Sequence, residues 1–147
     1  MTNVLVLHGP NLNLTGSREP QIYGTTSLQE IDEELRRRAQ NWGAELQIVQ
    51  SNHEGVLIDA LHQAAGWANG ALCNAGALTH YSFALRDAIA SVPYPVVETH
   101  LSLPASREPF RHVSVIAPVC MATVAGFGPH SYVLALEGLL HRLRDDS

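Results

Sequence analysis

Residues 4–24 read VLVLHGPNLNLTGSREPQIYG, an apolar run followed by a long polar segment. The run Val4 to Leu7 is wholly apolar, which is typical of a short parallel strand buried on both faces. The following residues, His8 to Gly24, lack apolar periodicity and predict a long loop at the carboxyl end of that strand. Ligands bind at this end of open α/β sheets, and loops of such length within a domain are usually functional. We therefore expect a ligand site here.

The rest of the chain alternates between strand-like and helical segments. Ser27 is placed to cap a helix, and Glu30 stands three residues later, as in a capping box. Strands are expected at residues 4–7, 46–49, 71–73, from 96 towards 100, and 113–116, and helices at 28–41, 54–65, 82–90 and 132–143. This alternation predicts an α/β fold of the flavodoxin-like class, with a five-stranded parallel sheet of order 2-1-3-4-5 and helices on both faces. Residues 1–147 contain no linker or repeat, so a single domain is expected.

The composition excludes several classes of function. The net charge is -5, and the basic residues, all arginine, form no stripe suited to nucleic acid. Because lysine is absent, neither Schiff-base chemistry nor a P-loop is possible. Cys73 and Cys120 lie in apolar surroundings and are expected to be free thiols in a reducing compartment. No signal peptide or membrane span is recognisable, so we expect a cytoplasmic protein without a membrane partner.

Polar residues follow three of the predicted strands. Asn11, Asn74 and the pair Glu98 and His100 should meet, because the carboxyl ends of parallel strands share one edge. Residues two apart on an extended chain point to one face, so Glu98 can fix the tautomer of His100 and favour its acid form. A purely structural histidine is the alternative. His8 also lies at a strand end, without an evident role.

Tyr23 is the candidate base in the polar segment. A free phenol has a pKa of about 10, so it is a poor base at neutral pH unless a cation stabilises the phenolate. Arg18 lies five residues earlier, and Arg111 could approach from elsewhere. From the residues alone, a tyrosine packed on the surface beside a solvated arginine is an equal alternative.

Further polar groups suit an anionic, polyhydroxylated small molecule. They are the backbone and hydroxyl of Leu101-Ser102, the amide of Asn74, and the side chains of His80, Asp87 and Arg111. His80 and Asp87 are seven residues apart, a spacing that could place them on one helical face. A structural role is an equal alternative for each of these last three residues. A base, an acid and an anion site together predict proton abstraction next to a carbonyl, with loss of water.

These residues closely resemble type II 3-dehydroquinate dehydratase over almost the whole chain. The resemblance is carried by residues 8–13, 16–24, 51–55, 74–76, 80–82, 85–89 and 107–114, by the pattern Glu98-x-His100-x-Ser102, and by Gly126-Phe127-Gly128. Several blocks in one order are far more specific than a single short motif. Two positions depart from the family pattern: Leu103 replaces a common asparagine, and Ala122 stands where glycine is frequent.

The resemblance implies a flavodoxin-like fold, a homododecamer built from four trimers, and neither a metal nor an organic cofactor. The implied reaction is the reversible dehydration of 3-dehydroquinate to 3-dehydroshikimate, in the shikimate pathway or in quinate breakdown. Tyr23 matches the base that removes the C2 proton as a tyrosinate, giving an enolate. His100 matches the acid that protonates the departing hydroxyl, and Glu98 matches its partner.

The resemblance also assigns the supporting residues. Arg18 matches an arginine on a mobile lid of about residues 16–24, and Asn11 matches a residue that stabilises the enolate through water. The implied substrate-binding positions are Asn74, His80, Asp87, Leu101, Ser102 and Arg111, with Asp87 offered across a subunit interface.

A second class of function is a non-enzymatic module that binds a nucleotide or flavin on the same fold. It predicts a glycine-rich phosphate loop or a basic cradle. Thr15-Gly16-Ser17 and Gly126-Phe127-Gly128 are only weak matches to such motifs. A metal hydrolase is disfavoured because no His and Asp cluster has the spacing of metal ligands.

Overall fold

The sheet of the protein has five parallel strands. The computed structural model describes residues 1–17 and 19–146. The strands are β1 (Thr2–His8), β2 (Ala44–Gln50), β3 (Gly70–Asn74), β4 (Val96–His100) and β5 (Ala122–Ala125). They pair in parallel in the order β2-β1-β3-β4-β5. The predicted flavodoxin-like sheet order is confirmed.

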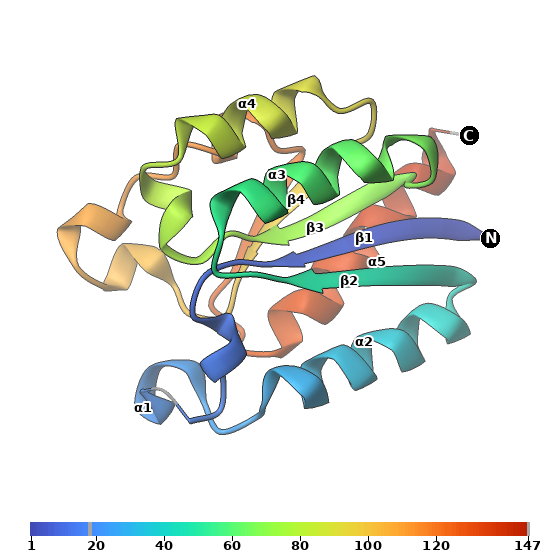
Figure 1. Ribbon diagram of the computed structural model, residues 1–147. Helices are drawn as coiled ribbons and strands as arrows, with labels where there is room; N and C mark the ends of the chain where they lie inside the picture. Colours follow the sequence, from blue (N-terminus) through green and yellow to red (C-terminus); the bar gives the residue numbers. More distant parts are fainter. Residues whose placement is uncertain (18, 147) are drawn as a thin grey trace.

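Helices cover both faces of this sheet. The α-helices are α1 (Pro20–Tyr23), α2 (Leu28–Asn41), α3 (Glu54–Gln63), α4 (Phe83–Ser91) and α5 (His130–Asp145). Helices α3 and α4 lie on one face, and α2 and α5 lie on the other (Figure 1). The carboxyl ends of the strands gather at the end opposite the chain termini, beside α1. No helix among the described residues is long and apolar enough to cross a membrane.

Each face of the sheet has its own hydrophobic core, and β1 contributes to both. Val4 and Val6 pack in the cluster under α2 and α5, whereas Leu5 and Leu7 pack in the cluster under α3 and α4. Successive residues of a strand point to opposite faces, so a strand with helices on both sides is apolar throughout. This explains why the apolar run 4–7 correctly predicted a strand buried on both faces.

The predicted helix start at Ser27 is confirmed. Its hydroxyl accepts a hydrogen bond from the Glu30 backbone N–H at 3.1 Å, and the Glu30 carboxylate accepts from the Ser27 N–H at 3.2 Å. These bonds satisfy backbone donors that the first helical turn cannot pair. The cap ends the polar segment and begins α2.

The prediction of a strand at residues 113–116 is wrong. The fifth strand is β5, whose residues pair with β4 from Val97↔Ala122 to His100↔Ala125. Residues 113–116 form a loop instead: the Val115 N–H donates to the Thr79 carbonyl, and Ile116 is buried under α4. Val113 is exposed and only Ile116 is fully buried, so the β-branched residues here indicated neither a strand nor a buried segment. β5 is a short edge strand with exposed residues, which leaves no apolar alternation to detect.

The segment from His8 to Gly24 is not one irregular loop, as the sequence suggested. It contains a 3₁₀ turn, η1 (Leu12–Leu14), and the single-turn helix α1. Leu12 is buried, and Pro20 supplies the first position of α1. Elements of one turn are too short to leave a periodic pattern, so sequence periodicity could not reveal them.

Candidate active site

A cavity opens at the carboxyl ends of β1, β3 and β4. Seven of the predicted site residues line it: Asn11, Asn74, His80, His100, Leu101, Ser102 and Arg111. They come from segments far apart in the sequence, as the convergence of parallel strand ends predicts. Close backbone packing builds the floor of the cavity. A Cβ on Gly9 would lie 2.5 Å from the Ala75 carbonyl carbon and oxygen, so only glycine lets these two loops approach.

His100 and Glu98 form a buried pair at one wall of the cavity. The Nε2 atom of His100 lies 2.5 Å from the Glu98 carboxylate, and both side chains are at most 9% exposed. A carboxylate only accepts, so Nε2 carries the proton of this bond. The bond occupies Nε2 and leaves Nδ1 as the ring nitrogen available to a ligand, and His100 lines the cavity.

Ser114 holds the second oxygen of Glu98, a role that sequence reasoning missed. Its hydroxyl donates to Glu98 Oε1 at 2.9 Å and accepts from the Ala117 N–H at 3.0 Å. The Ala117 N–H can only donate, so the serine proton must point to Glu98. Both carboxylate oxygens are therefore occupied, and the carboxylate cannot rotate away from His100. The one available signal was that Ser114 closes one of the resembling blocks, 107–114.

Asn74 provides an amide at the end of β3. Its Nδ2 donates to the Tyr132 hydroxyl at 3.0 Å, and its Oδ1 accepts from the Gly76 N–H at 3.2 Å. The side chain is almost wholly buried yet borders the cavity. Its remaining donor and acceptor capacity suits a ligand hydroxyl.

Two arginines, Arg107 and Arg111, line the cavity. Arg111 was predicted, and its Nε donates to Glu108 at 3.0 Å. Arg107 also lines the cavity, although we had not singled it out. It approaches the Ser102 hydroxyl at 3.4 Å and lies 3.8 Å from the Glu19 carboxylate. The Arg107 guanidinium beside the Ser102 hydroxyl suits a carboxylate ligand.

His80 presents a nitrogen with a defined protonation state. Its Nδ1 lies 2.8 Å from the Val113 carbonyl, which can only accept, so the proton sits on Nδ1. Burial lowers the pKa of His80, and the bond to Val113 partly opposes this effect. The neutral ring therefore offers Nε2 as an acceptor.

Asn11 and Asp87 differ in their relation to the cavity. Asn11 lines it with left-handed backbone (φ 69°), a conformation that asparagine tolerates better than most residues. Asp87 is exposed on α4 and is not part of the lining. His80 lies in the 3₁₀ turn η3 (Gly76–His80), before α4 begins at Phe83. The prediction that His80 and Asp87 share a helical face is therefore wrong, because the chain turns at Tyr81-Ser82.

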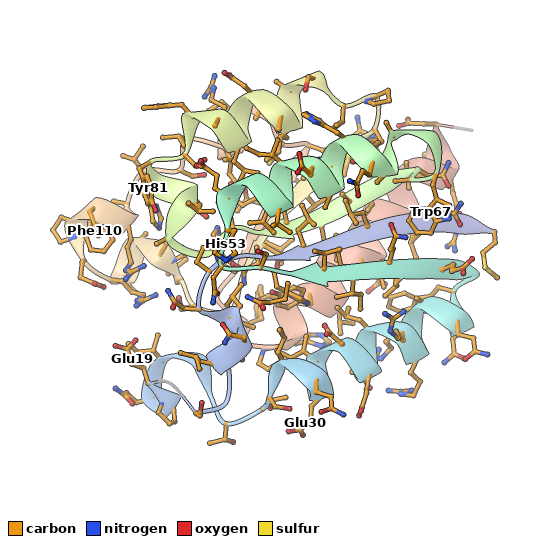
Figure 2. All side chains as sticks on the ribbon, viewed as in Figure 1. Glu19, Glu30, His53, Trp67, Tyr81 and Phe110 are labelled. Carbon is orange, nitrogen blue, oxygen red and sulfur yellow. The ribbon has the colours of Figure 1, made fainter. Side chains whose placement is uncertain are left out.

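Arg18, the predicted cation, and the side chain of Tyr23, the predicted base, lie outside the described part of the protein. Arg18 is not among the described residues, and Tyr23 is described only as the last backbone position of α1. Their neighbour Glu19 lies at the same end of the sheet as Phe110 (Figure 2). Within residues 1–17 and 19–146, no three His, Cys, Asp or Glu side chains are grouped as metal ligands would be.

The dehydroquinase class II family model matches residues 2–140 of the chain. The chain belongs to this family. It is 54% identical to the 3-dehydroquinate dehydratase of Ruegeria pomeroyi, over 97% of this chain and 96% of that protein. It is 56% identical to the 3-dehydroquinate dehydratase of a Nostoc species, over 97% of both chains. The resemblance inferred from the sequence is confirmed, and so is the enzyme class, a hydro-lyase.

Solved structures of the family have the same fold. The type II dehydroquinase of Butyrivibrio crossotus superposes with a TM-score of 0.92 at 40% identity, covering 94% of this chain and 97% of that one. The type II dehydroquinase of Propionibacterium acnes also superposes with a TM-score of 0.92, at 38% identity, covering 96% of this chain and 97% of that one. A dehydroquinase fold is therefore shared over nearly the whole length.

The positions that depart from the family pattern lie outside the catalytic pair. Leu103 is half-exposed after the cavity residue Ser102, and it faces Gly126, where an added Cβ would lie 3.6 Å from the Leu103 Cβ. Ala122 is the exposed first residue of β5. Neither residue lines the cavity.

Proposed function

We propose that this dehydroquinase catalyses the reversible dehydration of 3-dehydroquinate to 3-dehydroshikimate in the shikimate pathway. The observation that carries the proposal is the buried His100–Glu98 pair at the wall of a cavity that also holds arginines and amides. A proton donor beside a carboxylate-binding region matches a substrate that carries a carboxylate and loses a hydroxyl. The names of the relatives support the same substrate.

In the proposed mechanism, Tyr23 acts as a tyrosinate and removes the C2 proton, with Arg18 stabilising the phenolate. The electrons of the broken C–H bond form an enolate, which Asn11 stabilises through water. The enolate then collapses, the C–O bond breaks, and His100 delivers a proton from Nδ1 to the departing hydroxyl. Glu98 supports this step because a buried carboxylate stabilises the protonated ring. Residue roles follow from the family resemblance, and the cavity lining supports those of Asn11 and His100.

The other lining groups would bind the substrate. We assign the carboxylate to Leu101, Ser102 and Arg111, and hydroxyl groups to Asn74 and His80. The guanidinium of Arg111 and the Ser102 hydroxyl support the first assignment. The neutral acceptor Nε2 of His80 and the amide of Asn74 support the second.

Asp87 would reach the substrate of a neighbouring subunit in a homododecamer. Its exposed place on α4, outside its own cavity, supports this assignment. Exposed apolar side chains nearby also favour an interface: Tyr81, Phe83, Phe110 and Val113 are all more than half exposed. Tyr81 and Phe110 lie together at the cavity end of the sheet (Figure 2).

We further propose that residues 1–147 form one cytoplasmic catalytic domain, with residues 16–24 as a lid that brings Tyr23 to the substrate. The approach of Glu19 in this segment to Arg107 at the cavity supports a lid that docks on the site. Lids exclude water and complete a catalytic group on closure.

The decisive experiment adds 3-dehydroquinate to the purified protein and follows the ultraviolet absorbance of the conjugated enone product. We expect turnover that survives a chelator, because the proposed mechanism uses no metal. It should also survive borohydride, because the chain has no lysine for an imine. His100→Ala should abolish it, whereas His141→Ala, which changes an exposed histidine on α5, should not. No turnover by the folded wild type would refute the proposed function. Near-normal turnover by Tyr23→Phe would refute the assigned base.

A further inference from the structure

A buried chain of hydrogen bonds leads away from Asn74 into the core between the sheet and helices α2 and α5. The Tyr132 hydroxyl lies 3.0 Å from Asn74 Nδ2 and 2.8 Å from His8 Nδ1. The other nitrogen of His8, Nε2, lies 2.8 Å from Asp32 Oδ1. His8 and Tyr132 are fully buried, whereas the Asp32 side chain is 27% exposed. This series of hydrogen bonds, which we call the relay, thus runs from the cavity to the surface beside α2.

Donor and acceptor chemistry gives this chain one direction. The Gly76 N–H can only donate, so the Asn74 atom that it contacts is the amide oxygen, and the atom at Tyr132 is the nitrogen. That nitrogen donates to the phenol oxygen. The Asp32 carboxylate only accepts, so His8 carries its proton on Nε2 and donates it there. Nδ1 of the neutral ring is then an acceptor, and the phenol donates its own proton to it. Burial raises the pKa of Tyr132, which keeps the phenol protonated as this arrangement requires.

The consequence appears at Asn74. An asparagine amide that rotated by half a turn would exchange the donor and the acceptor that face the cavity. In this protein, such a rotation would set the amide oxygen against the phenol oxygen and the amide nitrogen against the Gly76 N–H. The phenol could then donate to Asn74 only by giving up His8, and the Gly76 N–H would lose its acceptor. Buried polar groups without partners are costly, so the relay excludes the rotated amide.

We propose that Tyr132, His8 and Asp32 are positioning residues that hold the Asn74 amide in its substrate-binding orientation. This inference rests on the proposed function for the identity of the substrate. The four residues come from α5, β1, α2 and β3, so the relay ties the cavity floor to both helices on one face of the sheet. Burying a histidine and a phenol costs desolvation free energy that a wholly apolar core would avoid, so packing alone does not account for these two residues.

The principal test replaces Tyr132 by phenylalanine, which removes the hydroxyl and keeps the ring. Tyr94→Phe is the matched control. Tyr94 is also buried, and its hydroxyl donates to the Leu61 carbonyl at 2.7 Å, but it lies in the core on the other face. Both variants lose one buried hydroxyl, so both should lower the melting temperature. Only Tyr132→Phe should raise KM for 3-dehydroquinate, by about tenfold, with kcat changing less.

A double-mutant cycle shows whether Tyr132 acts through Asn74. In an Asn74→Ala background the amide is already absent, so adding Tyr132→Phe should raise KM by less than twofold, roughly the error of an additive pair. An effect on KM that persists in full in that background would overturn the proposal. So would an unchanged KM in the single Tyr132→Phe variant.

The surface end of the relay supplies a second test, which holds even if Tyr132→Phe does not fold. Asp32→Ala removes the acceptor of His8, and Asp32→Asn restores an uncharged one. We expect Asp32→Ala to raise KM and Asp32→Asn to recover most of the loss. Equal KM values for Asp32→Ala and the wild type would refute a relay that reaches Asp32.

A structural readout separates failure of the relay from failure of the proposed function. In the ligand-free protein, the side-chain amide signals of Asn74 can be assigned in a ¹⁵N spectrum by their loss in Asn74→Asp. They should shift in Tyr132→Phe and in Asp32→Ala, and remain in place in Tyr94→Phe. Unmoved signals in Tyr132→Phe would overturn the relay whether or not the enzyme turns over substrate. Shifted signals in a protein without turnover would retain the amide relay and refute the proposed function.

Discussion

Glu98→Gln tests the electrostatic part of the site in isolation. The substitution keeps the shape of a side chain that is 3% exposed and removes its charge. In the wild type, the two carboxylate oxygens accept from His100 Nε2 at 2.5 Å and from the Ser114 hydroxyl at 2.9 Å. A glutamine has one oxygen and one nitrogen for these two donors, so it can satisfy only one of them in the present arrangement.

The expected loss follows from the bond that is weakened. A hydrogen bond to a charged group contributes about 1.5–3 kcal/mol, compared with about 0.5–1.5 kcal/mol for a neutral one, a difference of about 1–2 kcal/mol. If this difference holds His100 in the doubly protonated form that donates from Nδ1, its loss should lower the share of enzyme with a competent acid, and kcat should fall by about 5- to 30-fold. The unsatisfied donor adds to the cost, so kcat should fall by at least this amount.

The assay is the initial rate of enone formation, measured with the melting temperature of each variant. Glu34→Gln is the control, since Glu34 pairs with Arg37 and Arg38 on the surface of α2. The control should keep wild-type kcat. If folded Glu98→Gln also kept wild-type kcat, Glu98 would not stabilise the acid, and the reasoning from the buried pair would be wrong.

Three further predictions concern packing and titration. Gly9→Ala should lower the free energy of unfolding by about 1–3 kcal/mol, measured by urea denaturation, because its Cβ would lie 2.5 Å from the Ala75 carbonyl; unchanged stability would contradict the close packing of these loops. Burial lowers the pKa of His80, so the unfolded chain binds this proton at a higher pH than the folded protein does. The free energy of unfolding should therefore fall as the pH drops below about 6.5 towards the lowered pKa. His80→Asn should lessen this loss in melting temperature between pH 7 and pH 5, and an unchanged loss would exclude His80 as its source. Burial raises the pKa of the Cys120 thiol to about 12 and that of Cys73 further, so neither should react with a thiol reagent at pH 8 until the protein unfolds; rapid labelling of the native protein would contradict this.

Much of the site could be predicted because strand ends are visible in the sequence. Asn74 and His100 follow apolar runs that are buried on both faces, and parallel pairing then brings their side chains to one cavity. The spacing of Glu98 and His100 along an extended strand was enough to predict their hydrogen bond, which the structure confirms. These predictions succeeded because they depended on local periodicity and on a general property of parallel sheets.

Other features could not be predicted because they depend on contacts between distant segments. Ser114 lies in a segment that was expected to be a strand, and it meets Glu98 in a loop whose Val115 N–H donates to the Thr79 carbonyl. His8 had no evident role in the sequence, yet it bridges Tyr132 and Asp32, which lie 124 and 24 residues away from it. No pattern near His8 indicates either partner.

By itself, the sequence determined the class of fold, the order of the strands and the family. Buried strands and helix caps are visible within short stretches of sequence, and the family is visible in several blocks of residues that follow one another in a fixed order. Tertiary structure alone decided which edge strand completes the sheet, that Ser114 holds Glu98, and how the Asn74 amide is oriented. The physical reason is that a hydrogen bond depends on the position and direction of both partners. For partners far apart in the chain, packing of the folded protein sets these quantities.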